Sequence, residues 1–84
     1  MTLAEHSDTI RSRDDFLEFL KALRKDLLDN PGAWENTSLE RFLEALAGWV
    51  HDMDRYYLDQ SKPVPQQPDW KMVAEMLMAA SIYE

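Results

Sequence analysis

The chain of 84 residues carries 16 acidic side chains against nine Lys and Arg, a formal net charge of −7, and it contains no cysteine. This length allows one domain, and the lack of cysteine excludes a disulfide framework and a thiolate zinc site. The negative charge argues against nucleic acid and anionic membranes as partners, and no segment approaches the roughly 20 apolar residues of a membrane span.

Residues 1–11 show no sustained hydrophobic period. We therefore predict an irregular N-terminal arm, with Leu3 and Ile10 docking on the core. The segment also lacks the basic start and apolar run of a signal peptide, so we expect a cytoplasmic protein.

A first helix is predicted over residues 13–30. The hydroxyl of Ser12 can cap its first turn, where Asp14 and Asp15 are favoured by the helix dipole. Pro31 cannot continue a helix and ends it. One apolar stripe is expected to face the core and consists of Phe16, Phe19, Leu20, Leu23 and Leu27.

A second helix is predicted over residues 37–59, because Thr37 and Glu40 match a capping box. Its apolar side chains fall on one side, which is predicted to be core: Leu39, Phe42, Leu43, Leu46, Trp49, Val50, Met53 and Tyr57. Gly48 lies on the other side, where it either permits a close approach of another segment or is a tolerated surface glycine.

A third helix is predicted over residues 68–83. The three prolines from Pro63 to Pro68 favour an extended crossing before it, and Pro68 suits the first helical position. One apolar stripe, assigned to the core, contains Trp70, Val73, Leu77 and Ala80. A second stripe beside it contains Met72, Met76, Ala79 and Tyr83.

These elements predict an all-α fold: a single domain over residues 1–84, arranged as a compact three-helix bundle with an irregular N-terminal arm. The core of so short a chain is small, so self-association is a plausible source of added stability.

The stretch from His51 to Tyr57 concentrates titratable side chains, but on a helix they point in different directions. His51 is the only histidine within a predicted helix, which argues against a metal site built from several helices. The chain also lacks a nucleophile elbow and a Gly-rich phosphate loop. We therefore expect no catalytic site, no metal and no cofactor, and keep a carboxylate-based enzyme or metal protein only as a third alternative.

The leading hypothesis is a non-catalytic module that binds a basic protein through an acidic surface with aromatic anchors, since Trp and Tyr are favoured at interfaces. The alternative is that the charge serves only solubility and the aromatic rings fill the core. The predicted partner-binding residues are Trp34, Glu35, Glu44, His51, Asp52, Arg55 and Tyr56. A second hypothesis is a structural homodimer that pairs through Met72, Met76, Ala79 and Tyr83, because methionine suits adaptable interfaces.

Several short motifs resemble a family of small bacterial domains of unknown function, over about residues 12–84. The most specific are Trp34-Glu35-Asn36 before the second helix and Asp69-Trp70-Lys71 at the start of the third, followed by the closing Tyr83-Glu84. The resemblance implies a self-standing domain and assigns no activity and no functional residue. Some small acidic domains are immunity proteins that neutralise a toxin by binding it, which is an analogy of size and charge only.

Overall fold

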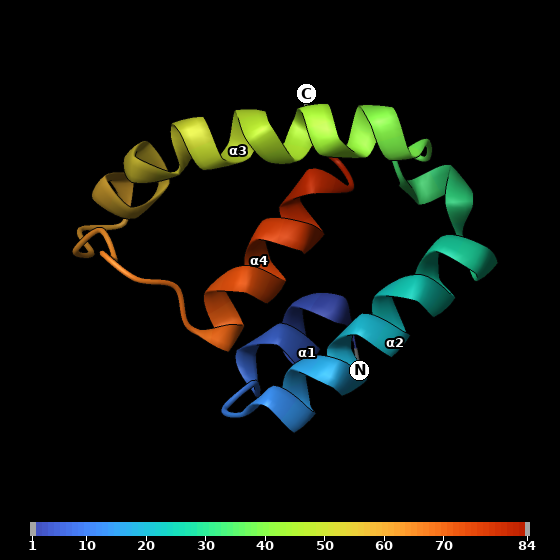
Figure 1. Cartoon of the computed structure of the whole chain (residues 1–84), viewed down its shortest axis with the longest axis horizontal. Coiled ribbons are helices and arrows are strands. Elements are labelled where there is room, and N and C mark those ends of the chain that lie inside the picture. Colours follow the sequence, from blue (N-terminus) through green and yellow to red (C-terminus); the bar gives the residue numbers. More distant parts are fainter. Residues whose placement is uncertain (1, 84) are drawn as a thin grey trace.

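A computed structural model describes residues 2–83, which contain four α-helices, one 3-10 helix and no strand (Figure 1). In chain order these are α1 (Leu3–Asp8), α2 (Arg13–Asp29), the 3-10 helix η1 (Pro31–Ala33), α3 (Leu39–Asp59) and α4 (Trp70–Ala80). The predicted all-α class is confirmed.

The helices begin where a side chain caps the first turn. The Ser12 hydroxyl accepts a hydrogen bond from the Asp15 amide at 3.1 Å, as predicted. The predicted caps of the other two long helices were displaced by one or two residues. Ser38 rather than Thr37 caps α3, and the Asp69 carboxylate caps α4 by accepting from the Met72 amide at 2.7 Å, so α4 begins after Pro68.

The prediction of an irregular N-terminal arm was wrong, because residues 3–8 form α1. The hydroxyl of Thr2 caps this helix by accepting from the Glu5 amide at 3.1 Å. A helix of six residues is too short to show a sustained hydrophobic period, which explains why the pattern missed it. The predicted docking is confirmed, since Ile10 is buried in the core and Leu3 packs against it.

The core lies where α4 meets α1 and α2. Its buried members are Ile10, Phe19, Leu23 and Ala74, with half-buried apolar side chains around them. Within the described chain α4 contacts each of the other α-helices, whereas α2 and α3 do not contact one another. Figure 1 shows α2 and α3 as the two arms of a V joined through η1, with α4 between them. The molecule measures 35 × 28 × 18 Å, so it is about two helix diameters thick.

This open arrangement leaves much of the predicted α3 core face uncovered. Met53 is buried, but Leu39, Leu43 and Val50 are 73%, 53% and 46% exposed. Their assignment to the core was wrong, because among the helices within residues 2–83 only α4 contacts α3, and it covers one side of the stripe. Trp70 was also assigned to the core, yet it is 43% exposed and stacks on Phe16 at the edge.

Candidate functional site

The segment before α3 is fastened to the end of α4 by Asn36. Its side-chain amide donates to the carbonyl oxygens of Ala80 at 2.9 Å and Tyr83 at 2.8 Å. The backbone N–H groups of Glu35 and Asn36 both donate to the Ser81 carbonyl oxygen, at 2.9 and 3.1 Å. These four bonds satisfy carbonyl groups at and after the end of α4, which have no partner within the helix. They also fix Glu35 and Tyr83 beside each other.

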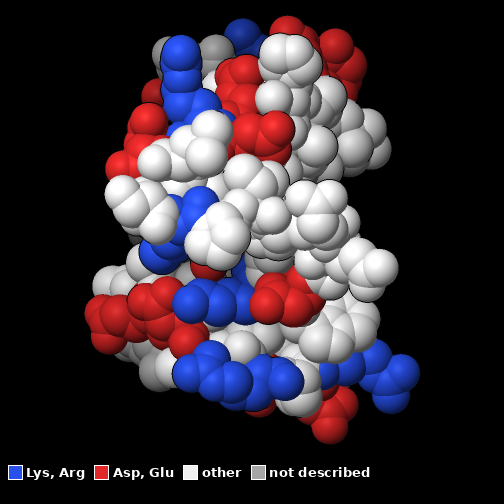
Figure 2. All heavy atoms as spheres, turned by 90° about the vertical axis from the view of Figure 1, so that its left-hand side faces the viewer, with Lys and Arg blue, Asp and Glu red and all other residues white. Residues whose placement is uncertain are grey.

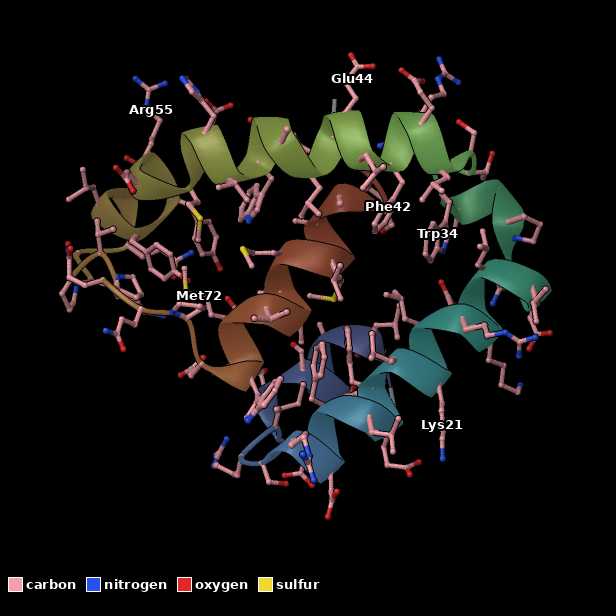
Figure 3. All side chains as sticks on the ribbon, viewed as in Figure 1. Lys21, Trp34, Phe42, Glu44, Arg55 and Met72 are labelled. Atoms are coloured by element: carbon pink, nitrogen blue, oxygen red, sulfur yellow. The ribbon has the colours of Figure 1, made fainter. Side chains whose placement is uncertain are left out.

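Trp34 directly precedes Glu35, and its side chain points to the inside of the V formed by α2 and α3 (Figure 3). Its indole N–H donates to Asp26 Oδ2 at 2.9 Å, and its ring stacks on Phe42 with 6.2 Å between the centroids. The side chain is half-buried and bridges α2 to α3. Trp34 therefore stands apart from the other predicted partner-binding residues.

A concavity of about 540 Å³ opens on the outer side of α3, and we name it the acidic hollow. Three carboxylates from two separate segments surround it, those of Glu35, Glu44 and Asp52, with Arg41 as the one basic side chain among the lining residues. The remaining lining residues are Asn36, Ala45, Gly48 and Tyr83. Glu44 points away from the rest of the molecule in Figure 3.

Tyr83 closes one end of the acidic hollow by crossing over α3. A Cβ atom at Gly48 would lie 3.3 Å from Cε2 of the Tyr83 ring. The glycine therefore permits a close approach of Tyr83 to α3, which is one of the two alternatives that the sequence left open. The ring also meets Trp49 edge-on, with centroids 5.5 Å apart. The Tyr83 hydroxyl donates a hydrogen bond to Asp52 Oδ2, and Oδ1 of the same carboxylate lies 2.9 Å from His51 Nδ1.

The Tyr83 hydrogen bond lowers the pKa of Asp52, and the contact with His51 lowers it further. The same hydrogen bond raises the pKa of the Tyr83 phenol. Both shifts favour the state in which the carboxylate is ionised and the phenol is protonated. The Asp52 carboxylate therefore stays ionised to a lower pH than an ordinary aspartate.

We predict that Tyr83→Phe moves the pKa of Asp52 back up, as measured by a carboxyl NMR titration. The lowered pKa means that the hydrogen bond stabilises the fold at neutral pH, and that this contribution is lost as the pH falls through the folded-state pKa of Asp52. Stability curves of wild type and Tyr83→Phe should therefore converge in acid. An unchanged Asp52 titration would contradict the hydrogen bond.

Two further predicted residues, His51 and Arg55, lie next to the acidic hollow. They line a shallow depression that shares Asp52 and Tyr83 with it. Arg55 points outward like Glu44 in Figure 3. The structure thus brings together five of the seven predicted residues on the outer side of α3: Glu35, Glu44, His51, Asp52 and Arg55.

The structure places Tyr56 elsewhere. Its ring packs on Trp49 with 5.1 Å between centroids, and it lines a separate concavity with Tyr57, Met72 and Glu75. Burial raises the pKa of Glu75 there, although Lys71 opposes the shift, and burial also raises the pKa of the Tyr57 phenol. Tyr56 therefore belongs to a different surface from the acidic hollow.

The predicted self-association stripe is divided in the structure. Met72, Met76 and Ala79 are half-buried on α4, whereas Tyr83 lies beyond the end of that helix. Met72 and Tyr83 line different concavities. The prediction grouped Tyr83 with the methionines because it extended the third helix to residue 83, whereas α4 ends at Ala80.

Arg41, Asn36 and Tyr83 complete the acidic hollow and were not among the predicted partner-binding residues. Nothing local in the sequence marks Arg41. Asn36 belongs to the Trp34-Glu35-Asn36 motif and Tyr83 to the closing Tyr83-Glu84 motif. The resemblance of both motifs to one family is the signal that could have placed them in the same site.

No group of three or more His, Asp or Glu side chains within residues 2–83 is arranged to hold a metal ion. Over the same residues, every helix is too short or too polar to cross a membrane.

A family of unknown function, DUF7660, matches residues 12–84. No curated protein and no solved structure shows significant similarity to the chain.

Proposed function

Because the chain belongs to this family, whose function is unknown, we propose a function from its own surface: a non-catalytic module that binds a basic protein partner through the acidic hollow. The observation that supports the proposal is that Glu35, Glu44 and Asp52 line one concavity together with Tyr83. Two of these carboxylates belong to α3, and the third belongs to Glu35, whose backbone N–H donates to the Ser81 carbonyl oxygen.

The chemistry of the hollow suits a lysine or arginine side chain of a partner. A carboxylate and a guanidinium or ammonium group form charge-assisted hydrogen bonds, and the neighbouring phenol ring offers apolar contact to the aliphatic part of the same side chain. The net charge of −7 would also speed the encounter with a basic protein. An inhibitor or immunity-type protein that covers a basic effector is one form of this function.

The test is affinity purification from the native host with wild type and two charge-reversal variants. Glu44→Lys changes the acidic hollow, and the matched control Asp59→Lys makes the same change in charge at the exposed end of α3. We expect a partner that wild type and Asp59→Lys retain at low salt and release at high salt, and that Glu44→Lys fails to retain. Equal recovery by all three proteins, or recovery of abundant chaperones only, would refute the proposal.

A further inference from the structure

Two apolar stripes are left uncovered by the open V. On α3 the stripe contains Leu39, Leu43 and Val50, spaced four and seven residues apart. On α2 it contains Leu17, Leu20 and Leu28, which are 48%, 37% and 62% exposed. The expectation that Leu20 faces the core was therefore wrong, because no other helix covers its side of α2 within residues 2–83. Exposed leucines that repeat at helical spacing on two neighbouring helices are typical of an interaction surface.

The α3 stripe and Leu20 of the α2 stripe face the same side of the molecule, whereas Leu17 and Leu28 lie within about 40° of Lys21 around α2. In Figure 3 Glu44 points up from α3 and Lys21 points down from α2. Steps of about 100° around each right-handed helix then place Leu43 and Val50, and likewise Leu20, toward the viewer. Figure 2 shows uncharged side chains over much of its right-hand side, which is the side that faces the viewer in Figure 1.

Opposite charges accompany the two stripes. Arg13 and Arg24 lie within the α2 stripe, whereas Glu40 and Asp54 lie along the outer edge of the α3 stripe. Among residues 2–83, none of these four side chains forms an ion pair. The stripe on α2 is therefore accompanied by basic side chains, and the stripe on α3 by acidic ones.

The two stripes also match in length and direction. The chain runs toward the junction of the V along α2 and away from it along α3 (Figure 1). At about 1.5 Å per residue, Arg13 lies about 24 Å from the junction end of α2, and Asp54 about 22 Å from that of α3. On the same scale Leu20 and Val50 lie at about 14 and 16 Å, and Leu28 and Leu39 both lie within about 2 Å of those ends.

We propose that a second copy of this chain docks face to face on these two stripes, with α2 of each copy lying antiparallel on α3 of the other. A two-fold axis along the bisector of the V brings the α2 stripe of one copy, with Arg13 and Arg24, onto the α3 stripe of its partner, with Glu40 and Asp54, twice per dimer. The contact covers Leu20, Leu39, Leu43 and Val50 of each copy and sets Arg13 against Asp54 of the other copy. One chain carries both the stripe with basic residues and the stripe with acidic residues, and each stripe complements the other. A second copy of the chain therefore fits both stripes at once, which an unrelated helix would not.

This dimer does not depend on the function proposed above. The acidic hollow lies around Gly48 and Asp52, on the opposite side of α3 from the stripe. Each dimer therefore presents two acidic hollows, and loss of the dimer leaves each of them intact.

The dimer is tested by sedimentation equilibrium of the purified chain and of Leu43→Gln. We expect twice the monomer mass for wild type, and a dissociation constant raised about tenfold or more by Leu43→Gln because two leucines leave the contact. Ile82→Gln is the matched control, since Ile82 is 58% exposed and lies outside both stripes, and it should not weaken the dimer. Circular dichroism checks that both variants keep the wild-type helix content.

Charge reversal tests the antiparallel pairing directly. Arg13→Glu and Asp54→Arg should each weaken the dimer on the order of tenfold, because each places like charges opposite one another at both ends of the contact. An equimolar mixture of the two variants restores both pairs in a heterodimer and should regain wild-type affinity. A monomeric wild type at the highest concentrations reached, or a mixture no tighter than its components, would overturn the proposal.

Discussion

Replacing Asn36 with aspartate is expected to lower the free energy of unfolding by about 2–4 kcal/mol. The substitution keeps the size of the side chain but removes the two N–H donors that reach the carbonyl oxygens of Ala80 and Tyr83. It leaves those part-buried carbonyls unpaired and sets a carboxylate against the negative end of α4. Urea unfolding followed by tryptophan fluorescence measures the loss.

The matched control for this prediction is Gln67→Glu, the same amide-to-acid exchange at an exposed position between α3 and α4. We expect it to change the stability by less than about 0.5 kcal/mol. If Asn36→Asp were no more destabilising than Gln67→Glu, the fastening of the Asn36 segment to α4 would be wrong. The acidic hollow would then lack the contact that holds Glu35 beside Tyr83.

The sequence predicted the long helices because their signals are local. Ser12 caps α2, Pro31 follows its end, and the 3.6-residue apolar period marks α3. The errors at Thr37 and Pro68 came from choosing between adjacent residues that both suit a helix start. The short α1 was missed because its six residues complete fewer than two turns.

The tertiary arrangement was harder to predict, since an apolar stripe shows which face of a helix avoids water but not what covers it. Leu43 and Met53 belong to one stripe of α3, yet the first is exposed and the second is buried. The difference depends on where α4 crosses α3, and on the lack of contact between α2 and α3. Neither is encoded in the spacing of residues along one helix.

The same distinction applies to the acidic hollow. Glu44, His51, Asp52 and Arg55 share α3, and helical periodicity alone places all four on the side of that helix away from its apolar stripe. Tyr83 joins them through contacts between residues 31 or more positions apart in the chain. Only the fold brings those segments together.

Replacing Phe19 with alanine is expected to cost about 3–5 kcal/mol, the range for deleting a large buried ring. Phe19 is 0% exposed and joins three helices at the centre of the core. Its ring meets His6 of α1 edge-on at 6.0 Å and stacks near Phe16 of α2 at 6.5 Å, and the core cluster continues to Ala74 of α4. A chain of this size has a total stability of only about 4–12 kcal/mol, so this one change is expected to remove much of it.

The loss at Phe19 should involve α3 as well, although α3 makes no contact with Phe19's own helix. Among the other α-helices α3 packs only on α4, so α4 must be in place for α3 to bury Met53. Thermal unfolding of Phe19→Ala should therefore remove all the helical signal in one transition at lower temperature, whereas Leu58→Ala, at a side chain 65% exposed, should leave the midpoint nearly unchanged. A Phe19→Ala protein that kept α3 folded after α1 and α2 had melted would show that α3 and α4 form a stable unit of their own.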